Sequence, residues 1–459
     1  MADAVRERKR ERRKRRKHLE RALEQRKSRP ETVPSVDGPT RQDHRATDQA
    51  HEGHLQEKDI TGLKYFERLA PLLETLHQDA CERDKAGNRA LHFDQYCLLI
   101  LLYLFNPIVR SLRGIQQASE LHKVQQTLGC SRASLGSLSE AASVFDAERL
   151  KQIIGQLGAQ LQPLGRDERL QDIDLALTLV DGSLIAALPA IMEASWRKRT
   201  DGSGLVKWRL HTHFEVDRYV PLRIDVTADG GGEHDERAVL ERTIESDRLY
   251  VMDRGYAKFA LFNAIVAARS SYVCRLRDNS VYEVVELCEL TAADRAAGIL
   301  SDQIVSLGNR GKAAARPDHQ LRLICVKCSP HTSRGKYKGA STGPSSDGVL
   351  RIATNLLDVP AEIIALLYSE RWTIEIFFRF FKHLLGCRHL LSHSQNGIEI
   401  QTYCAIIACL LISLWTGRKP TKRTYEMICF YFCGLASEAE LLAHLAKLKR
   451  QDEAKSKKR

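Results

Sequence analysis

The chain has 459 residues, of which 43% are hydrophobic and 7% are aromatic. This content excludes a wholly disordered chain and is sufficient for several folded modules. The formal net charge of +12 is concentrated at the two ends: residues 1–30 hold 14 Lys/Arg and 5 Asp/Glu, and residues 442–459 hold 7 and 2. The body between them is close to neutral. Attraction of the ends to nucleic acid would therefore be electrostatic and blind to base sequence.

Cysteine usage and hydrophobic runs argue against a secreted or membrane protein. Twelve cysteines are too few for a disulfide scaffold in a chain of this length, and several, such as Cys404 and Cys409, lie in apolar runs. No apolar segment follows the charged N-terminus, as a secretory signal would require. The longest apolar run, residues 404–415, is too short to cross a bilayer. We therefore expect a cytoplasmic protein with no membrane partner.

The first third of the chain predicts a tail followed by helices. Residues 1–58 are basic, polar and interrupted by prolines, which is typical of a disordered tail. Residues 59–170 carry apolar side chains at helical spacing and predict a helical DNA-binding domain. Ser131 and Ser134 are candidate N-caps after the turn at Gly129, a pattern compatible with a helix-turn-helix that reads DNA. Plain helical packing is the alternative and explains the pattern at least as well.

From about residue 175 the pattern of hydrophobic residues changes from helical spacing to the short apolar or alternating runs typical of strands. Residues 171–280 read in order as three strands, a helix that Asp235 can cap, a strand, a helix and a strand. This order predicts an α/β fold with a ribonuclease-H-like mixed sheet. Residues 281–357 add strand-like pieces around a Gly/Ser/Lys-rich loop and predict a β-rich insertion. Residues 358–416 return to the core with a long helix, and residues 417–459 predict a helical basic segment.

Two aspartates end hydrophobic strands at points where the chain can turn: Asp181 in "TLVDGS" and Asp253 in "YVMDRGY". A carboxylate at such a position costs on the order of several kcal/mol if it is buried without a partner or a metal ion. Aspartates are common at strand ends, so either residue alone is a weak sign of a site.

The segment "YSERWTIEIFFRFFK" adds a third element. On a continuous helix, Tyr368, Arg371, Glu375 and Lys382 would fall within about 60° of one another. The other faces are apolar, so we expect a buried helix with one polar stripe that faces a cleft. Alternatively, Glu375 pairs with Arg371 four residues away while Lys382 extends to solvent. That alternative does not explain why Tyr368 shares the same face.

The spacing Tyr-x2-Arg-x3-Glu-x6-Lys, after an Asp-Gly strand and an Asp-Arg-Gly-Tyr strand end, resembles the bacterial insertion-sequence transposases of the DDE type with the Tyr-Arg-Glu-Lys signature. The resemblance covers about residues 170–416 and includes "LLSHSQNGIEIQTYCAIIACLLI" after the signature. It implies a ribonuclease-H-like core with a β-rich insertion and a homodimer that brings two transposon ends together. It also implies that the partner is double-stranded DNA, both as transposon ends and as target. The expected location is the bacterial cytoplasm, in association with the nucleoid.

The same resemblance implies roles for single residues. The catalytic, metal-binding triad would be Asp181, Asp253 and Glu375. The residues that contact DNA phosphates near the cleaved end would be Tyr368, Arg371 and Lys382. Three carboxylates suit Mg²⁺ or Mn²⁺, and two such ions can support both hydrolysis of a DNA strand and attack by the freed 3′-hydroxyl. The expected activity is therefore cut-and-paste transposition.

Two other clusters are weaker candidates for metal sites. Cys325 and Cys328 form a Cys-x2-Cys pair, but it lies within a strand and no second pair is nearby, so we do not expect zinc. His211 and His213 share a strand face but lack an obvious third ligand, so we expect them to be structural.

Three alternative functions remain open from the sequence. The chain could be an inactive or domesticated DNA-binding protein, although all three carboxylates are present. It could be a metal-dependent nuclease that cuts without joining. A hydrolase acting on a substrate other than nucleic acid is disfavoured by the basic ends and by the Arg/Lys stripe, which suits phosphate.

Overall fold

The computed structural model describes residues 69–79, 90–185, 208–228, 231–308, 316–328, 347–384, 391–392 and 394–456. The chain divides into two units, Met1–Gln56 and Glu57–Arg459, and the described residues all belong to the second. The predicted basic tail at residues 1–58 and residues 332–346 of the Gly/Ser/Lys-rich loop lie outside these ranges.

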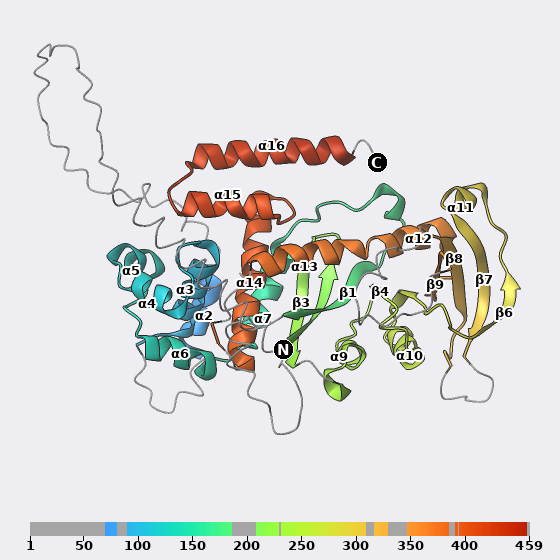
Figure 1. The fold of residues 1–459 in the computed structure, drawn as a ribbon, viewed down its shortest axis with the longest axis horizontal. Coiled ribbons are helices and arrows are strands. Elements are labelled where there is room, and N and C mark those ends of the chain that lie inside the picture. The colour runs from blue at the N-terminus through green and yellow to red at the C-terminus, as the bar shows by residue number, and fades with distance from the viewer. Residues whose placement is uncertain are drawn as a thin grey trace, which may run out of the picture. The chain divides into compact units, whose positions relative to one another are not determined.

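One mixed sheet of nine strands forms the centre of the second unit, in the order β3-β2-β1-β4-β5-β9-β8-β7-β6 (Figure 1). The strands are β1 Ala176–Ile185, β2 Trp208–Glu215, β3 Val220–Ala228, β4 Arg248–Met252, β5 Ser271–Arg275, β6 Tyr282–Leu287, β7 Ile299–Leu307, β8 Leu321–Lys327 and β9 Val349–Thr354. β4 runs parallel to both β1 and β5, and every other neighbouring pair is antiparallel.

Alternate side chains of the central strands feed two cores on opposite faces of the sheet. On β4, Leu249 and Val251 join the core that includes α12 (Ala361–Ser369) and α13 (Trp372–Leu384). Tyr250 and Met252 join the core that includes α9 (Glu236–Arg242) and α10 (Phe259–Ala267). This alternation follows from the two-residue period of a strand. The order of three strands, helix, strand, helix, strand agrees with the sequence prediction, and Asp235 caps α9 by accepting from the Arg237 N–H at 2.9 Å.

The predicted insertion continues the central sheet. β9 pairs with β5, and β8, β7 and β6 follow it outward. The sequence indicated β6, β8 and β9 but not β7, whose Asp302 is a charged residue at a buried position, 4% exposed. α11 (Ala292–Ala296) precedes β7.

The remaining described helices are α2 Ala70–Asp79, α3 Phe93–Phe105, α4 Leu112–Ser119, α5 His122–Leu128, α6 Leu135–Val144, α7 Arg149–Gln160, α14 Gln395–Thr416, α15 Lys422–Phe432 and α16 Glu438–Ser456. α14 packs against α3, α6, α7 and β3, and so joins the N-terminal helices to the sheet. Its 22 residues are long and apolar enough to cross a membrane, but 89% of its most apolar window is buried in the protein core. The helical segment expected at residues 417–459 consists of two helices, α15 and α16.

In the segment proposed for DNA reading, the helix α6 exposes polar uncharged side chains and a glutamate. Gly129 turns the chain between α5 and α6 with a φ of +58°, and Ser134 caps α6 by accepting from the Ser137 N–H at 3.0 Å. α6 buries Leu138, while Glu140 is exposed and no Lys or Arg lies on this helix. A helix that enters a DNA groove usually presents basic or amide side chains. The structure therefore favours the packing alternative for α6.

The signature segment is not one continuous helix, so the expectation of a single helical face is wrong. α12 ends at Ser369 and α13 begins at Trp372, with a tight turn between them. The Arg371 N–H donates to the Tyr368 carbonyl at 3.1 Å, a three-residue spacing in place of four. The Thr373 hydroxyl and N–H both bond Glu370, at 3.1 and 2.8 Å, and such local bonds compete with helix continuation.

A buried ion pair in the insertion fixes the start of α12. The Arg322 guanidinium donates to both carboxylate oxygens of Asp302, at 2.7 and 2.5 Å, and the two side chains are 8% and 3% exposed. The same guanidinium donates to the carbonyls of Leu357 (3.1 Å) and Val359, just before α12. One side chain therefore joins β7, β8 and the approach to the signature segment.

We predict that Asp302→Ala lowers the free energy of unfolding by about 3–5 kcal/mol, because it leaves the Arg322 charge buried without its partner. Urea unfolding followed by circular dichroism measures the change. The control is Glu426→Ala, which breaks an exposed pair with Lys422 at 3.6 Å and should cost at most about 1 kcal/mol. Equal effects of the two substitutions would contradict the role given to Arg322.

Candidate active site

The two predicted aspartates lie side by side on neighbouring strands. Asp253 follows the end of β4, as expected, but Asp181 lies within β1 opposite Thr212 of β2, so the expectation that it ends a strand is wrong. The parallel register of β1 and β4 ends with Val180 opposite Met252, and the next residues are Asp181 and Asp253. Paired strands lie about 4.8 Å apart, so the two backbones are close at this point. In sheets of this kind, sites form at the carboxyl ends of parallel strands.

Asp181 lies in an environment that disfavours its charge. Burial raises the pKa of Asp181 to about 7; the Arg371 guanidinium opposes this rise, and the neighbouring Asp253 and Glu236 carboxylates add to it. Its Oδ1 accepts the N–H of Gly182 at 2.9 Å. A carboxyl group with this pKa is readily stabilised by a cation, because a cation favours the charged form.

Glu236 is a fourth carboxylate at this point, and the sequence analysis missed it. It is the first residue of α9, and its side chain lies against Gly182, where any Cβ would clash with it. A Cβ on Gly255 would lie 3.9 Å from the other Glu236 oxygen and 2.8 Å from Asp253 Oδ1. Glu236 forms an ion pair with Arg209 of β2. The signal in the sequence was a glutamate directly after the cap Asp235, which alone does not indicate proximity to a distant strand.

Tyr256 adds a buried hydroxyl near the carboxylates. Its side chain is 1% exposed, and within the described part of the chain its hydroxyl has no hydrogen-bond partner. Burial raises the pKa of Tyr256 well above its usual value, and the charges of Glu236, Asp181 and Asp253 raise it further. The neutral hydroxyl is therefore a donor held close to an acidic cluster.

Arg371 connects the signature segment to this cluster. It forms an ion pair with Glu375 at 2.7 Å, and its charge opposes the rise in the pKa of Asp181. Its Cζ lies 6.0 Å from the ring centroid of Tyr368 and 5.3 Å from that of Trp372. The local Arg371–Glu375 pairing that the sequence left as an alternative is thus present, and it lies at the site.

Lys382 is the signature residue that the structure does not bring to this group. It lies seven residues beyond Glu375 on α13, about 10 Å along the helix axis. It forms no ion pair with any residue in the described ranges. The buried faces of α13 agree with the sequence except at Ile376, which is 54% exposed, and Trp372 next to the site is 52% exposed.

The residues present fit a divalent cation at the aspartate pair. Asp181 and Asp253 offer only oxygen ligands, which Mg²⁺ and Mn²⁺ prefer, and burial, with a smaller contribution from the neighbouring carboxylates, raises the pKa of Asp181, so a bound cation would favour its charged form. In the described residues, no three or more His, Cys, Asp or Glu side chains converge as a ready metal cage. Glu375 is held by Arg371 and would join an ion only after that pair opens.

The two weaker metal candidates are packed into the fold. His211 Nε2 lies 2.8 Å from the Thr227 hydroxyl, and His213 Nε2 lies 3.0 Å from the Thr243 hydroxyl. Burial lowers the pKa of His211 to about 4 and that of His213 to about 3, so both stay neutral at pH 7. Cys325 is buried in β8. Cys328, which follows the end of β8, is partly exposed. The hydrogen bonds and burial of the two histidines are those of packed core residues.

Known proteins with similar sequences are transposases. The chain is 27% identical over 302 residues to y4zB of Sinorhizobium fredii, named as a transposase; the match covers 65% of this chain and 73% of that protein. It is 25% identical over 222 residues to a protein named as the transposase of insertion sequence element IS5377 from Geobacillus stearothermophilus, covering 48% and 52%. It is 22% identical over 340 residues to InsL of insertion sequence element IS186A from Escherichia coli, covering 70% and 84%.

Among solved structures, the chain is similar to piggyBac transposase in a synaptic complex with hairpin DNA, with 11% identity and a TM-score of 0.37 over 84% of this chain and 82% of that one. The family described as "Transposase DDE domain" matches residues 174–411, which contain Asp181, Asp253 and Glu375. Since this range spans more than half of the 459 residues, the chain belongs to the transposase DDE-domain family.

Proposed function

We propose that this protein is a transposase that binds the double-stranded ends of its insertion sequence as a homodimer and catalyses metal-dependent DNA cleavage and strand transfer. The observation that supports the proposal is the register of β1 and β4, which brings Asp181 and Asp253 side by side, with the charge of Arg371, the partner of Glu375, acting on Asp181. With this function, we interpret the central sheet as a ribonuclease-H-like core. The family, which the sequence match establishes, supports the same reading.

In this proposal the catalytic residues are Asp181, Asp253 and Glu375. Two divalent ions, Mg²⁺ or Mn²⁺, would when bound activate the attacking oxygen and stabilise charge on the phosphate. The aspartates would supply fixed oxygen ligands from a rigid sheet. Glu375 would complete the set from α13, and its freedom to do so depends on Arg371.

Arg371 has a second proposed task at the scissile phosphate. A guanidinium can bind a phosphate through two parallel hydrogen bonds, as it binds a carboxylate. Exchange of Glu375 for a DNA phosphate would keep Arg371 neutralised and would free Glu375 at the same moment. Tyr368 would support the guanidinium from α12, and Lys382 would contact a more distant phosphate as a point charge.

The first test is substitution of each catalytic residue. Asp181→Ala, Asp253→Ala and Glu375→Ala should each reduce strand cleavage by about 10²–10³-fold or more, since a loss of about 10²–10³ is typical for one group that stabilises developing charge. DNA-end binding should be retained because the phosphate contacts remain. Labelled terminal DNA and a target plasmid, incubated with Mg²⁺ and resolved on a gel, give both readouts. Glu233→Ala is the control, since Glu233 is exposed beside α9.

The products of the unaltered protein separate the possible functions. Joined products support the transposase. Cleaved but unjoined DNA would establish a nuclease, and binding without cleavage would establish a DNA-binding protein. Full cleavage by any of the three alanine variants would remove that residue from the proposed triad.

A second test uses the pKa of Asp181, which is about 7 in the folded protein and 3.8 ordinarily. The folded state therefore binds an additional proton between about pH 4 and pH 7, and the free energy of unfolding falls as pH rises through this window. We predict that, with metal removed by EDTA, Asp181→Asn stabilises the protein at pH 8 by on the order of 2 kcal/mol and changes little at pH 4. One pKa unit corresponds to about 1.4 kcal/mol, and relaxation reduces the full value.

Asp225→Asn is the control with the opposite sign. Burial alone would raise the pKa of Asp225, but Arg223 and Lys151 hold it below its ordinary value. Its carboxylate therefore contributes stability above about pH 4 that is lost at lower pH, so its substitution should destabilise the protein more at pH 8 than at pH 4. Urea unfolding at the two pH values measures both variants. If Asp181→Asn destabilised the protein at pH 8, the claim that the charged Asp181 carboxylate lowers the stability of the fold would be contradicted.

A further inference from the structure

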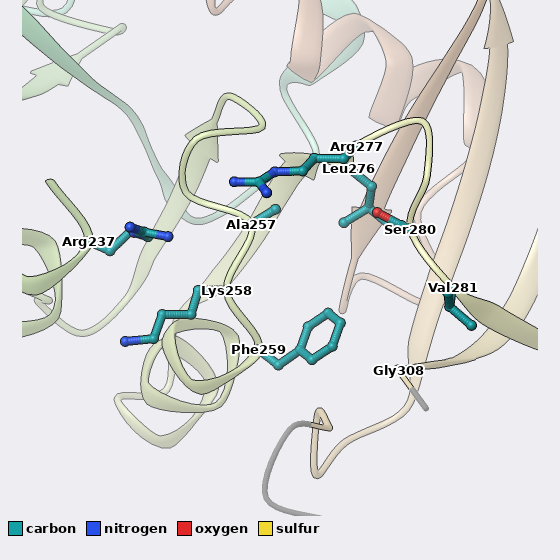
Figure 2. Close-up of a pocket in the computed structure, with 9 residues that line it drawn as sticks. All are labelled: Arg237, Ala257, Lys258, Phe259, Leu276, Arg277, Ser280, Val281 and Gly308. Atoms are coloured by element: carbon teal, nitrogen blue, oxygen red, sulfur yellow. The ribbon is translucent and has the colours of Figure 1, made fainter. Parts of the chain in front are cut away.

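A cavity of about 370 Å³ is lined by residues that follow Glu236 and Asp253 closely in the chain (Figure 2). It lies between the start of α10, the connection from β5 to β6 and the end of β7. No role has been given to it so far. Its lining combines three cationic side chains with an apolar wall.

The cationic side of the pocket is formed by Arg237, Lys258 and Arg277. In Figure 2 the charged ends of all three side chains lie to the left of the Phe259 ring. Arg237 is bound by Asp235 at 2.8 Å, whereas Lys258 and Arg277 are exposed and form no ion pair with a described residue. The group therefore carries an excess of about two positive charges and is suited to a phosphate.

The apolar side is formed by Phe259, Leu276 and Val281. Phe259 is half-buried, and its ring extends away from the cations in Figure 2. Val281 is 61% exposed and is therefore accessible to a ligand in the cavity. An exposed aromatic and aliphatic surface next to cations is the combination that holds single-stranded nucleic acid, through base stacking and backbone contacts.

The chain itself ties this pocket to the catalytic cluster. Arg237 directly follows Glu236, and Lys258 follows Asp253 by five residues. Five residues span at most about 18 Å, and the turn from the Tyr256 N–H to the Asp253 carbonyl (3.2 Å) shortens this path. One stacked strand rises about 3.4 Å per nucleotide, so the pocket lies within about five nucleotides of a phosphate bound at the aspartates.

We propose that this pocket binds one nucleotide of the DNA strand that passes through the active site, a few nucleotides from the scissile phosphate. The cations would hold the phosphate, and Phe259 with Val281 would cover the base. In this proposal the described cationic side chains of the lining are engaged by the phosphate, and stacking on Phe259 is tolerant of base identity, so we expect little preference for one base. The inference rests on the proposed function, because it takes DNA as the substrate.

The test compares two terminal DNA duplexes with the full-length protein. One is blunt at the cleavage point, and the other carries a five-nucleotide thymidine extension beyond it. Fluorescence anisotropy measures the dissociation constant of each duplex. The ratio of the two constants gives the contribution of the extension to binding, because the basic ends of the chain contribute equally to both. For the unaltered protein we expect the extension to strengthen binding about tenfold, through roughly two phosphate contacts and one stacked base.

Lys258→Ala/Arg277→Ala should reduce that ratio to about one, and Phe259→Ala should reduce it without changing the salt dependence. The matched control is Arg295→Ala/Lys327→Ala, which removes two exposed cations at the opposite end of β7 and should leave the ratio unchanged. Thermal unfolding verifies that each variant is folded. An unchanged ratio of dissociation constants in the pocket variants would overturn the proposal. Displacement of the extension by thymidine monophosphate of equal affinity would also overturn it, because the pocket would then be a site for free nucleotides.

Cleavage and joining of the same duplexes distinguish the two proposals. If the unaltered protein cuts and joins DNA but the pocket substitutions leave the ratio of dissociation constants unchanged, the pocket assignment fails. The proposed transposase function is then retained. If the unaltered protein neither binds nor cuts terminal DNA, the proposed function fails, and the pocket assignment falls with it.

Discussion

The parallel pairing of β1 with β4 is the constraint on which the site depends. Its register ends at Val180 and Met252, so the next residues of the two strands start side by side, and both are aspartates: Asp181 continues β1 along β2, and Asp253 leaves β4. Two carboxylates at adjacent positions repel one another, and burial of Asp181 adds to the unfavourable energy. The pKa of about 7 at Asp181 records both effects. A fold that maintains such a pair against its own stability is typical of a functional site.

Two arginine–glutamate pairs flank the aspartates and limit this unfavourable charge. Arg371–Glu375 comes from the signature segment, and Arg209–Glu236 joins β2 to α9. With all groups ionised, four carboxylates and two guanidiniums leave a net charge of −2, which is the charge that one divalent cation neutralises. Each pair also holds a glutamate close to the aspartates without adding its full charge to them. The cluster can thus persist without an ion and can still gain from binding one.

The sequence allowed prediction of the features that depend on local pattern. Strand runs and turn residues gave the order of elements around Asp181 and Asp253, and the spacing of the signature indicated that Arg371 and Glu375 belong together. Features that depend on tertiary contact were not predictable. Glu236 reaches the site only because Gly182 leaves room on a distant strand, and β7 was missed because its buried Asp302 is neutralised from β8. The break before Trp372 arises from local bonds that a helical period does not reveal.

That break gives the insertion a structural role in the active site. α12 packs against β4, β5, β7 and β8, whereas α13 packs against β1, so the turn that carries Arg371 joins two differently anchored helices. Arg322 holds the approach to α12 from within the insertion. The position of Arg371 relative to Asp181 is therefore set jointly by the core sheet and by strands about 50 residues earlier in the chain. Because a guanidinium bonds through a rigid fork, a small shift of α12 would weaken its hold on Glu375. The insertion thus supports the geometry of the carboxylate cluster as an integral part of the same sheet.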